Sequence, residues 1–305
     1  MSKVSILVGD CLTRLKQLPD NSTDAIITDP PYFKVKGEAW DNQWSDADKF
    51  IEWIGTVAEQ WQRLLKPNGS LYCFASSRMS ARVEVELSRR FNILNRIRWA
   101  KPKFATKAEM FRKEDLRTFF PSSEEIIFAE HYGAKSLPGH MESCRKSAGF
   151  SRPQVGRALS VDSRLVDKWE TQRGERDSCE PTDTQFDAAM RLYGRDSEVE
   201  CWRRPFNAMP DAPYTDTWTF DTVKSYPGKH PCEKPQELLR HILRTSTRPG
   251  AVVLDCFMGG GSMGEACVRE GRDFIGMEQN EEYVATARKR IADACGLFGS
   301  VEVQQ

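Results

Sequence analysis

The chain has 305 residues, 39% hydrophobic and 29% charged, which suits one large α/β domain with an insertion or two modest domains. Its 44 basic and 44 acidic residues balance, so net charge alone does not indicate a nucleic-acid-binding protein. No apolar stretch has the length of a membrane span, and the first residues lack the pattern of a signal peptide, which excludes a membrane protein.

The first part of the chain alternates strand and helix patterns. Short apolar runs predict strands at residues 4–8, 24–28, 70–75, 93–99 and 125–130. Helical patterns cover residues 11–18, 47–65 and 79–90, and the Lys-Pro-Asn-Gly sequence at 66–69 predicts the end of the second helix. This alternation predicts an α/β fold with a mostly parallel, doubly wound sheet that has helices on both faces.

Residues 29–32, Asp-Pro-Pro-Tyr, directly follow the apolar run at 25–28. An acid, two prolines and an aromatic ring at a strand end suit a flat, nitrogen-bearing ring. The carboxylate of Asp29 accepts hydrogen bonds from an exocyclic amino group, Pro30 aims its carbonyl at the same group, and Tyr32 offers a stacking face. A simple turn is the alternative interpretation of Asp-Pro-Pro.

Basic residues gather between residues 76 and 120, where twelve Lys or Arg residues stand against five acidic ones. Clustering of this size predicts a surface that faces nucleic-acid phosphates. Within it, Arg98, Lys101 and Lys103 are the predicted DNA contacts. A solvated helical face is the alternative explanation of the run.

The strand and helix alternation stops between about residues 133 and 228. Within this stretch, capping residues predict two short helices, at 152–159 and 163–170. Two short helices about a tight turn predict a helix-turn-helix over residues 151–170. Its exposed face is predicted to reach DNA bases or phosphates through Ser163, Arg164 and Lys168. The alternative is a helical hairpin that serves only packing.

The alternation resumes with a helix at 236–245. An apolar run at 251–254 then leads into a glycine-rich turn and a helix, and a further strand ends at Glu278. Glycines let the backbone approach a ligand closely, and the start of the following helix offers free amide donors. An acid at the end of the second strand of such a unit commonly binds ribose hydroxyls. The pattern therefore predicts a site for a nucleotide-like ligand.

Four segments in this order resemble the amino-methylating DNA methyltransferases. They are Asp-Pro-Pro-Tyr at 29–32, His-Pro-Cys-Glu-Lys-Pro at 230–235, the Asp-x-Phe-x-Gly-x-Gly motif at 255–261, and Glu278. More narrowly, the order resembles the circularly permuted beta-type arrangement, in which the catalytic half precedes the cofactor half. The resemblance covers roughly residues 4–132 and 226–295.

The resemblance implies a Rossmann-like methyltransferase domain made of residues 1–132 and 226–305. Residues 133–225 would be a helical target-recognition insertion, and the helix-turn-helix-like stretch resembles inserts of phage and prophage members. S-adenosylmethionine is the implied cofactor. The implied cofactor-binding residues are Phe257, Gly259, Gly261, Ser262, Lys234 and Pro235 at its methionine part, Asp255 near its ammonium, Glu278 at its ribose, and Asp10 and Cys11 at its adenine.

The implied reaction is methyl transfer to the exocyclic nitrogen of a base in double-stranded DNA, at a catalytic motif made of Asp29, Pro30, Pro31 and Tyr32. Asp29 and the Pro30 carbonyl, accepting from the amino hydrogens, favour a tetrahedral nitrogen aimed at the methyl donor. The base must leave the stack, and Tyr32 would stack on it. Adenine N6 is favoured over cytosine N4, because in the resembling families an aspartate at the first motif position accompanies adenine more often.

Several alternatives stay open. One is an RNA or cytosine-N4 methyltransferase with the same motif, although a helix-turn-helix favours duplex DNA. Attack on a pyrimidine by Cys232 is another, and replacing Cys232 with alanine tests it. A third is a catalytically silent DNA-binding regulator. A homodimer and a cognate restriction endonuclease are further partners that the resemblance suggests, and the recognition sequence cannot be derived from an insertion of this kind.

Nine cysteines are scattered through strands, helices and loops, and no Cys-x-x-Cys pair occurs. This pattern predicts reduced thiols and no metal centre. Together with the resemblance, it predicts a protein of the bacterial cytoplasm, encoded by the host or by a phage.

Overall fold

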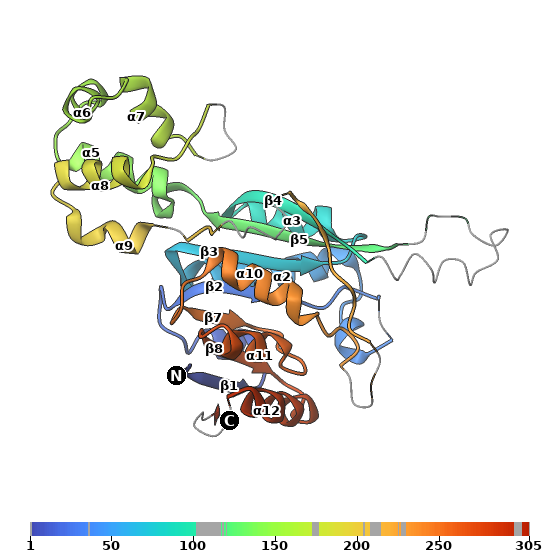
Figure 1. Ribbon diagram of the computed structural model, residues 1–305. Coiled ribbons are helices and arrows are strands. Elements are labelled where there is room, and N and C mark those ends of the chain that lie inside the picture. Colours follow the sequence, from blue (N-terminus) through green and yellow to red (C-terminus); the bar gives the residue numbers. More distant parts are fainter. Residues whose placement is uncertain are drawn as a thin grey trace.

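Within the described residues, nine strands form one sheet in the computed structural model, in the spatial order β6-β4-β5-β3-β2-β7-β8-β1-β9 (Figure 1). The structure describes residues 2–35, 37–101, 117, 119, 121–172, 177–203, 205–207, 215–224, 226, 230–295 and 301–304. The strands are β1 (Val4–Val8), β2 (Thr23–Thr28), β3 (Leu65–Ala75), β4 (Phe91–Ala100), β5 (Ser123–His131), β6 (Thr217–Thr219), β7 (Val252–Asp255), β8 (Asp273–Glu278) and β9 (Val301–Gln304).

The strand directions confirm the predicted mostly parallel sheet. Strands β3, β2, β7, β8, β1 and β9 each run parallel to their neighbours in that series. Strand β5 lies between β3 and β4 and is antiparallel to both, and β6 runs parallel to β4 at the edge. Because the carboxyl ends of parallel strands meet at one edge of a sheet, the segments that follow β2, β7, β8 and β1 are brought together.

Helices cover both faces of the sheet, as the doubly wound prediction requires. One face carries α1 (Cys11–Leu15), α2 (Ala47–Leu64) and α3 (Ser80–Ser88). The other carries α10 (Gln236–Ser246), α11 (Ser262–Arg269) and α12 (Glu281–Cys295). Along β2 the side chains alternate between these two cores, since Ala25 and Ile27 pack into one and Ile26 into the other.

Helix α2 shows how the sequence pattern produces an element. The side chain of Asp46 caps its start by accepting a hydrogen bond from the backbone N–H of Lys49 at 2.9 Å. Its buried side is formed by apolar residues at helical spacing, among them Phe50, Ile54 and Trp61. The chain does not turn away afterwards. Strand β3 begins at Leu65, so the Lys-Pro-Asn-Gly segment opens a strand and not a loop.

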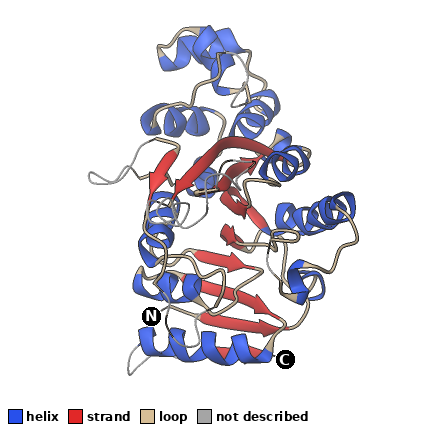
Figure 2. Ribbon diagram, turned by 90° about the vertical axis from the view of Figure 1, so that its right-hand side faces the viewer, coloured by secondary structure: helices blue, strands red, loops and turns tan. Residues whose placement is uncertain are grey.

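The insertion is a separate group of helices at one end of the molecule (Figures 1 and 2). It contains α5 (Leu137–Ser147), α6 (Arg152–Leu159), α7 (Ser163–Trp169), α8 (Asp183–Leu192) and α9 (Val199–Trp202), with the short 3-10 helices η3 (Gly133–Lys135) and η4 (Asp196–Glu198). These helices bury their own core, which includes Met141, Val155, Trp169 and Phe186. The predicted pair of short helices is therefore present, as α6 and α7.

The predicted end of the insertion at residue 225 is too late. Strand β6 lies inside the predicted range but pairs with β4, and Trp218 is buried in the core of the main domain. The chain has returned to that domain even earlier, because the ring of Phe206 stacks on Phe128 and Asn207 donates its backbone N–H to Thr245 at 2.8 Å. A three-residue strand has too few residues to show an alternating pattern. Among the described helices, none has the length and apolar character needed to cross a bilayer.

Candidate active site

Acidic residues follow four adjacent parallel strands at one edge of the sheet. Asp29 comes directly after β2, Asp255 ends β7, Glu278 ends β8, and Asp10 comes two residues after β1. Strands β2 and β7 are neighbours, and the hydroxyl of Thr28 donates to Asp255 Oδ1 at 2.9 Å. The sheet thus joins two segments that lie more than two hundred residues apart in the chain.

A cavity of about 420 Å³ opens at this edge and is lined by both segments. Its size is that of a small-molecule site. The predicted site residues that line it are Asp10, Cys11, Asp29, Pro30, Pro31, Tyr32, Lys234, Asp255, Phe257, Gly259, Ser262 and Glu278. Two predicted residues do not line it. Gly261 caps the start of α11, and Pro235 caps the start of α10.

The glycine-rich turn adopts a backbone that side chains disfavour. Gly259 has φ +51° and Gly261 has φ +80°. A Cβ at Gly261 would lie 2.7 Å from the Cβ of Ala287, so this glycine lets α12 pack against the turn. The carboxylate of Glu278 braces the turn by accepting the N–H of Gly259 at 3.0 Å and that of Asn280 at 2.9 Å. Burial raises the pKa of Glu278.

Asp255 is a buried acid held by donors from both halves. Besides the Thr28 hydroxyl, the backbone N–H of Phe257 donates to Asp255 Oδ1 at 3.1 Å. Burial raises the pKa of Asp255 to about 7, and the nearby carboxylates of Asp29 and Glu278 add to this, while the hydrogen bonds oppose it. A cationic ligand in the cavity would favour the ionised form.

Asp29 has one occupied and one free carboxylate oxygen. Its Oδ2 accepts a hydrogen bond from the ammonium of Lys234, whose side chain is 7% exposed. Its Oδ1 is buried and has no hydrogen-bond partner among the described residues. Burial raises the pKa of Asp29, an effect that the charge of Lys234 partly offsets. A buried carboxylate oxygen without a partner is costly unless a ligand supplies a donor.

The hydroxyl of Tyr32 is directed toward a second acid. It donates to Glu124 Oε2 at 2.9 Å, and the ring lies under the Lys234 ammonium at 5.2 Å. Burial, with Asp29 and Glu124 beside it, raises the pKa of Tyr32, so the phenol stays neutral. The backbone N–H of Tyr32 donates to Asp41 Oδ1 at 2.6 Å, which fixes the motif against the short helix η1 (Ala39–Asp41).

Glu124 is a residue of this site that the sequence analysis did not find. It lies near the start of β5, and both of its oxygens are engaged, Oε1 by Lys101 and Oε2 by Tyr32. The Lys234 ammonium lies 3.6 Å from the same Oε2. Burial alone would raise the pKa of Glu124, but the ammonium groups of Lys234 and Lys101 hold it below its usual value.

A family model described as DNA methylase (N6_N4_Mtase) matches residues 23–289. The chain belongs to this DNA methylase family. The methylase is therefore an S-adenosylmethionine-dependent DNA methyltransferase, as its sequence pattern suggested.

Two curated relatives match the methylase along nearly its whole length. It is 27% identical to the DNA adenine methyltransferase YhdJ of Escherichia coli (strain K12), over 98% of this chain and 86% of the relative. It is 25% identical to the Type II methyltransferase M2.DpnII of Streptococcus pneumoniae, over 95% of this chain and 90% of the relative.

Solved structures show the same fold. The M1.HpyAVI–SAM complex superposes on the methylase with a TM-score of 0.56 at 23% identity, covering 94% of this chain and 98% of that chain. The PvuII DNA methyltransferase, a cytosine-N4-specific enzyme, does so with a TM-score of 0.60 at 18% identity, covering 96% and 88%.

The cavity of the methylase fits this cofactor in charge. S-adenosylmethionine carries a sulfonium and an ammonium group, and it supplies an electrophilic methyl group when bound. Among the residues that line the cavity, five are acids and one is a lysine. The acids are Asp10, Asp29, Glu233, Asp255 and Glu278, and the lysine is Lys234. Such a lining attracts a cationic ligand.

Of the predicted DNA contacts in the basic stretch, the structure exposes one and encloses another. The side chain of Arg98 is 63% exposed and lies 3.4 Å from Glu125. Lys101 does not face solvent as expected, because its side chain is 11% exposed, pairs with Glu124 and lies over the ring of Trp99. Counting charge along the sequence cannot tell an exposed lysine from one that pairs with a buried acid. Lys103 lies outside the described residues.

The predicted DNA contacts in the insertion lie on α7. Arg164 is exposed, and Ser163 and Lys168 are half-buried. Helices α6 and α7 are joined by a tight turn in which Ser160 has φ +54°. Glu170, directly after α7, is buried and binds two arginines, Arg145 of α5 at 2.6 Å and Arg152 of α6 at 2.8 Å. The helix pair is thus fixed on its inner side.

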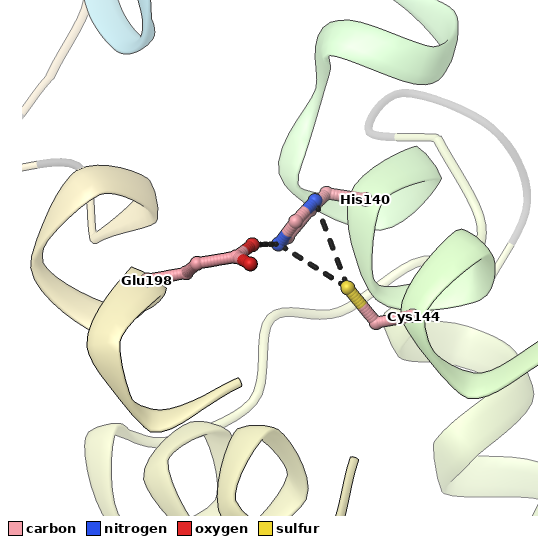
Figure 3. A group of neighbouring side chains, drawn as sticks. All are labelled: His140, Cys144 and Glu198. Carbon is pink, nitrogen blue, oxygen red and sulfur yellow. Dashed lines mark hydrogen bonds and ion pairs between the residues drawn. The ribbon is translucent and has the colours of Figure 1, made fainter. Parts of the chain in front are cut away.

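One group of potential metal ligands occurs among the described residues, and it lies in the insertion. His140 and Cys144, one turn apart on α5, meet Glu198 of η4 (Figure 3). His140 Nε2 lies 3.2 Å from Glu198 Oε2, while Cys144 Sγ lies 3.4 Å from Nε2 and 3.8 Å from Nδ1. The sulfur is therefore beside the ring and not beyond the Nε2 lone pair, and Trp202 stacks on the ring at 3.8 Å. These groups pack η4 against α5, and the absence of a metal stays a prediction.

Proposed function

We propose that the methylase transfers the methyl group of S-adenosylmethionine to N6 of adenine in double-stranded DNA, after the base has been flipped into the cavity. The observation that supports this most strongly is the free Oδ1 of Asp29, a buried acceptor in the wall of a cavity whose other walls carry the cofactor motifs. An exocyclic amino group is a donor that satisfies it.

The residues of the motif would act by position and hydrogen bonding. An exocyclic amino nitrogen is a poor nucleophile, because its lone pair is delocalised into the ring. Asp29 Oδ1 and the carbonyl of Pro30 would accept the two amino hydrogens and direct the lone pair toward the methyl donor. Pro31 restricts the backbone between them, and Tyr32 in the cavity wall would support the ring of the base. No covalent intermediate with the enzyme is needed.

Adenine is the proposed base for two reasons. The motif begins with an aspartate, which in the resembling families accompanies adenine more often than cytosine. The relative YhdJ is named as an adenine methyltransferase and matches nearly the entire chain. Cytosine N4 is the second candidate, since the cytosine-N4-specific PvuII enzyme shares the fold.

The helical insertion is the proposed DNA-reading part. Helices α6 and α7 would act as a helix-turn-helix, with Ser163, Arg164 and Lys168 toward the duplex and Arg98 at the main domain. The relative M2.DpnII is named as a Type II methyltransferase, so a restriction–modification role with a cognate endonuclease is part of the proposal, as are a homodimer and a cytoplasmic location.

Nucleoside analysis tests the proposed reaction. The protein is incubated with methyl-labelled S-adenosylmethionine and with DNA that lacks methylation, and the DNA is digested to nucleosides and separated. The label is expected in N6-methyldeoxyadenosine. Label in N4-methyldeoxycytidine would replace adenine by cytosine, label only in a parallel RNA sample would refute the DNA substrate, and no label in any sample would support a silent DNA-binding regulator.

A further inference from the structure

Lys234 occupies the place at Asp29 that a substrate amino group needs. Its ammonium donates to Asp29 Oδ2 and lies 3.3 Å from the carbonyl of Cys232. Burial favours the neutral amine, but Asp29 and Glu124 raise the pKa of Lys234 above its usual value, so the group stays charged. An amino group that donates both hydrogens near Asp29 therefore meets a cation already bound there.

A second acceptor for this cation lies within reach. The distance from Lys234 Nζ to Glu124 Oε2 is 3.6 Å, slightly beyond a hydrogen bond, and a small rotation of the lysine side chain would close it. Glu124 itself is held in place, since Lys101 binds its Oε1 and Tyr32 donates to its Oε2. The rings of Tyr32 and Phe74 flank the ammonium at 5.2 and 5.0 Å and would guide it between the two acids.

We propose that Glu124 is a positioning residue that receives the Lys234 ammonium when the amino group of the target base takes its place at Asp29. This inference rests on the proposed function, because it assigns the base to Asp29. Lys234 would thus hold Asp29 ionised in the free enzyme and release it as the base enters.

The charges of the site favour this exchange. Asp29 and Glu124 are two acids, and Lys101 and Lys234 are two bases, so the enclosed group is neutral. The entering amino group is neutral as well. Transfer of Lys234 from one acid to the other therefore keeps every buried charge paired, whereas expulsion of Lys234 without a second acceptor would leave a buried charge unpaired.

Replacement of Glu124 by glutamine removes the second acceptor and keeps the shape of the side chain. Lys234 then has a single carboxylate left and stays on Asp29. We expect kcat/KM of the Glu124→Gln variant for methylation of unmethylated plasmid DNA to fall by about 10- to 100-fold, the value of one charge-assisted hydrogen bond. Affinity for S-adenosylmethionine, measured by calorimetry, should change little. Glu130→Gln is the matched control, as a buried acid of the same strand that bonds Asn92.

The double variant Glu124→Gln/Lys234→Met separates the proposal from a structural role. In Glu124→Gln alone the site carries an excess positive charge, and the lysine blocks Asp29. Removing that lysine as well restores neutrality and frees Asp29. We therefore expect the double variant to be at least about 5-fold more active than Glu124→Gln when both are assayed at about pH 9, where Asp29 ionises without its partner. Glu124→Asp should recover part of the activity.

The outcomes are distinct from those that bear on the proposed function. If the wild-type protein transfers no methyl group to DNA, the proposed function fails. If it does, and Glu124→Gln matches Glu130→Gln in kcat/KM, the positioning role is refuted. A double variant less active than Glu124→Gln, with an unchanged melting temperature, would refute it too, because a lysine that merely stabilises the site adds to the loss.

Discussion

Asp29 and Asp255 are neighbouring acids at one edge of the sheet, but their surroundings give them different properties. Asp255 receives donors from Thr28 and Phe257 on one oxygen, which fixes its orientation. Asp29 faces the Lys234 ammonium with one oxygen and offers the other to the cavity. The first suits a fixed counter-charge for a cationic cofactor, and the second suits an acceptor for an incoming donor.

The pKa of Asp255 predicts how cofactor affinity depends on pH. Since burial raises this pKa to about 7, the carboxyl is mostly protonated below that pH and ionised above it. A cationic ligand prefers the ionised form, so affinity for S-adenosylmethionine should rise as the pH increases from about 6 to about 7.5, by up to about tenfold per pH unit. Calorimetry checks this. Asp255→Asn should bind more weakly and lose the dependence, and the same slope in both proteins would contradict the assignment.

At the residue scale, the sequence revealed the motif residues but not their partners. Asp29 and Tyr32 were predictable because they follow a strand in an unusual order of residue types. Glu124 was not, because Glu125 is its neighbour and adjacent strand residues point to opposite faces. The pairing of β4 with β5, which sets Glu124 opposite Trp99 and Glu125 opposite Arg98, decides which acid faces the site. Lys101 was misplaced for the same reason.

At the element scale, the pair α6 and α7 depends on Gly156. A Cβ at this position would lie 2.8 Å from the carbonyl oxygen of Val161 and 3.1 Å from the nitrogen of Ser163, both of which are backbone atoms. Gly156→Ala should therefore push the helices apart and destabilise the insertion by about 1–3 kcal/mol. Thermal unfolding and DNA affinity should both be affected. Ala158→Ser, at an exposed position of the same helix, is the control, and equal behaviour of the two variants would argue against this packing.

Helix α7 should contribute to DNA affinity through its cations. Replacing Arg164 and Lys168 with glutamine is expected to weaken DNA binding and to reduce the slope of log affinity against log salt by up to about 0.9 per lost phosphate contact. Fluorescence anisotropy over a salt series measures both quantities. Lys289→Gln on α12, an exposed cation on another face, is the control. An unchanged slope in the double variant would reduce the insertion to a structural role.

At the scale of the whole molecule, two segments from opposite ends of the chain form one site because β2 and β7 are neighbours. The order of the strands followed from periodicity and from the family resemblance. The pairing of β6 with β4 did not, since its residues show no pattern of their own. Each half contributes a separate task, with the segment after β2 facing the base and the segments after β7 and β8 facing the cofactor.

The division of tasks is tested most directly by Asp29→Ala. Methyl transfer to DNA and calorimetric affinity for S-adenosylmethionine are measured on the same preparation, with Glu278→Ala as the variant of opposite expectation. Asp29→Ala should lose transfer and keep cofactor binding nearly unchanged, whereas Glu278→Ala should lose cofactor binding. An Asp29→Ala protein that methylates DNA at the wild-type rate would contradict the assigned chemistry.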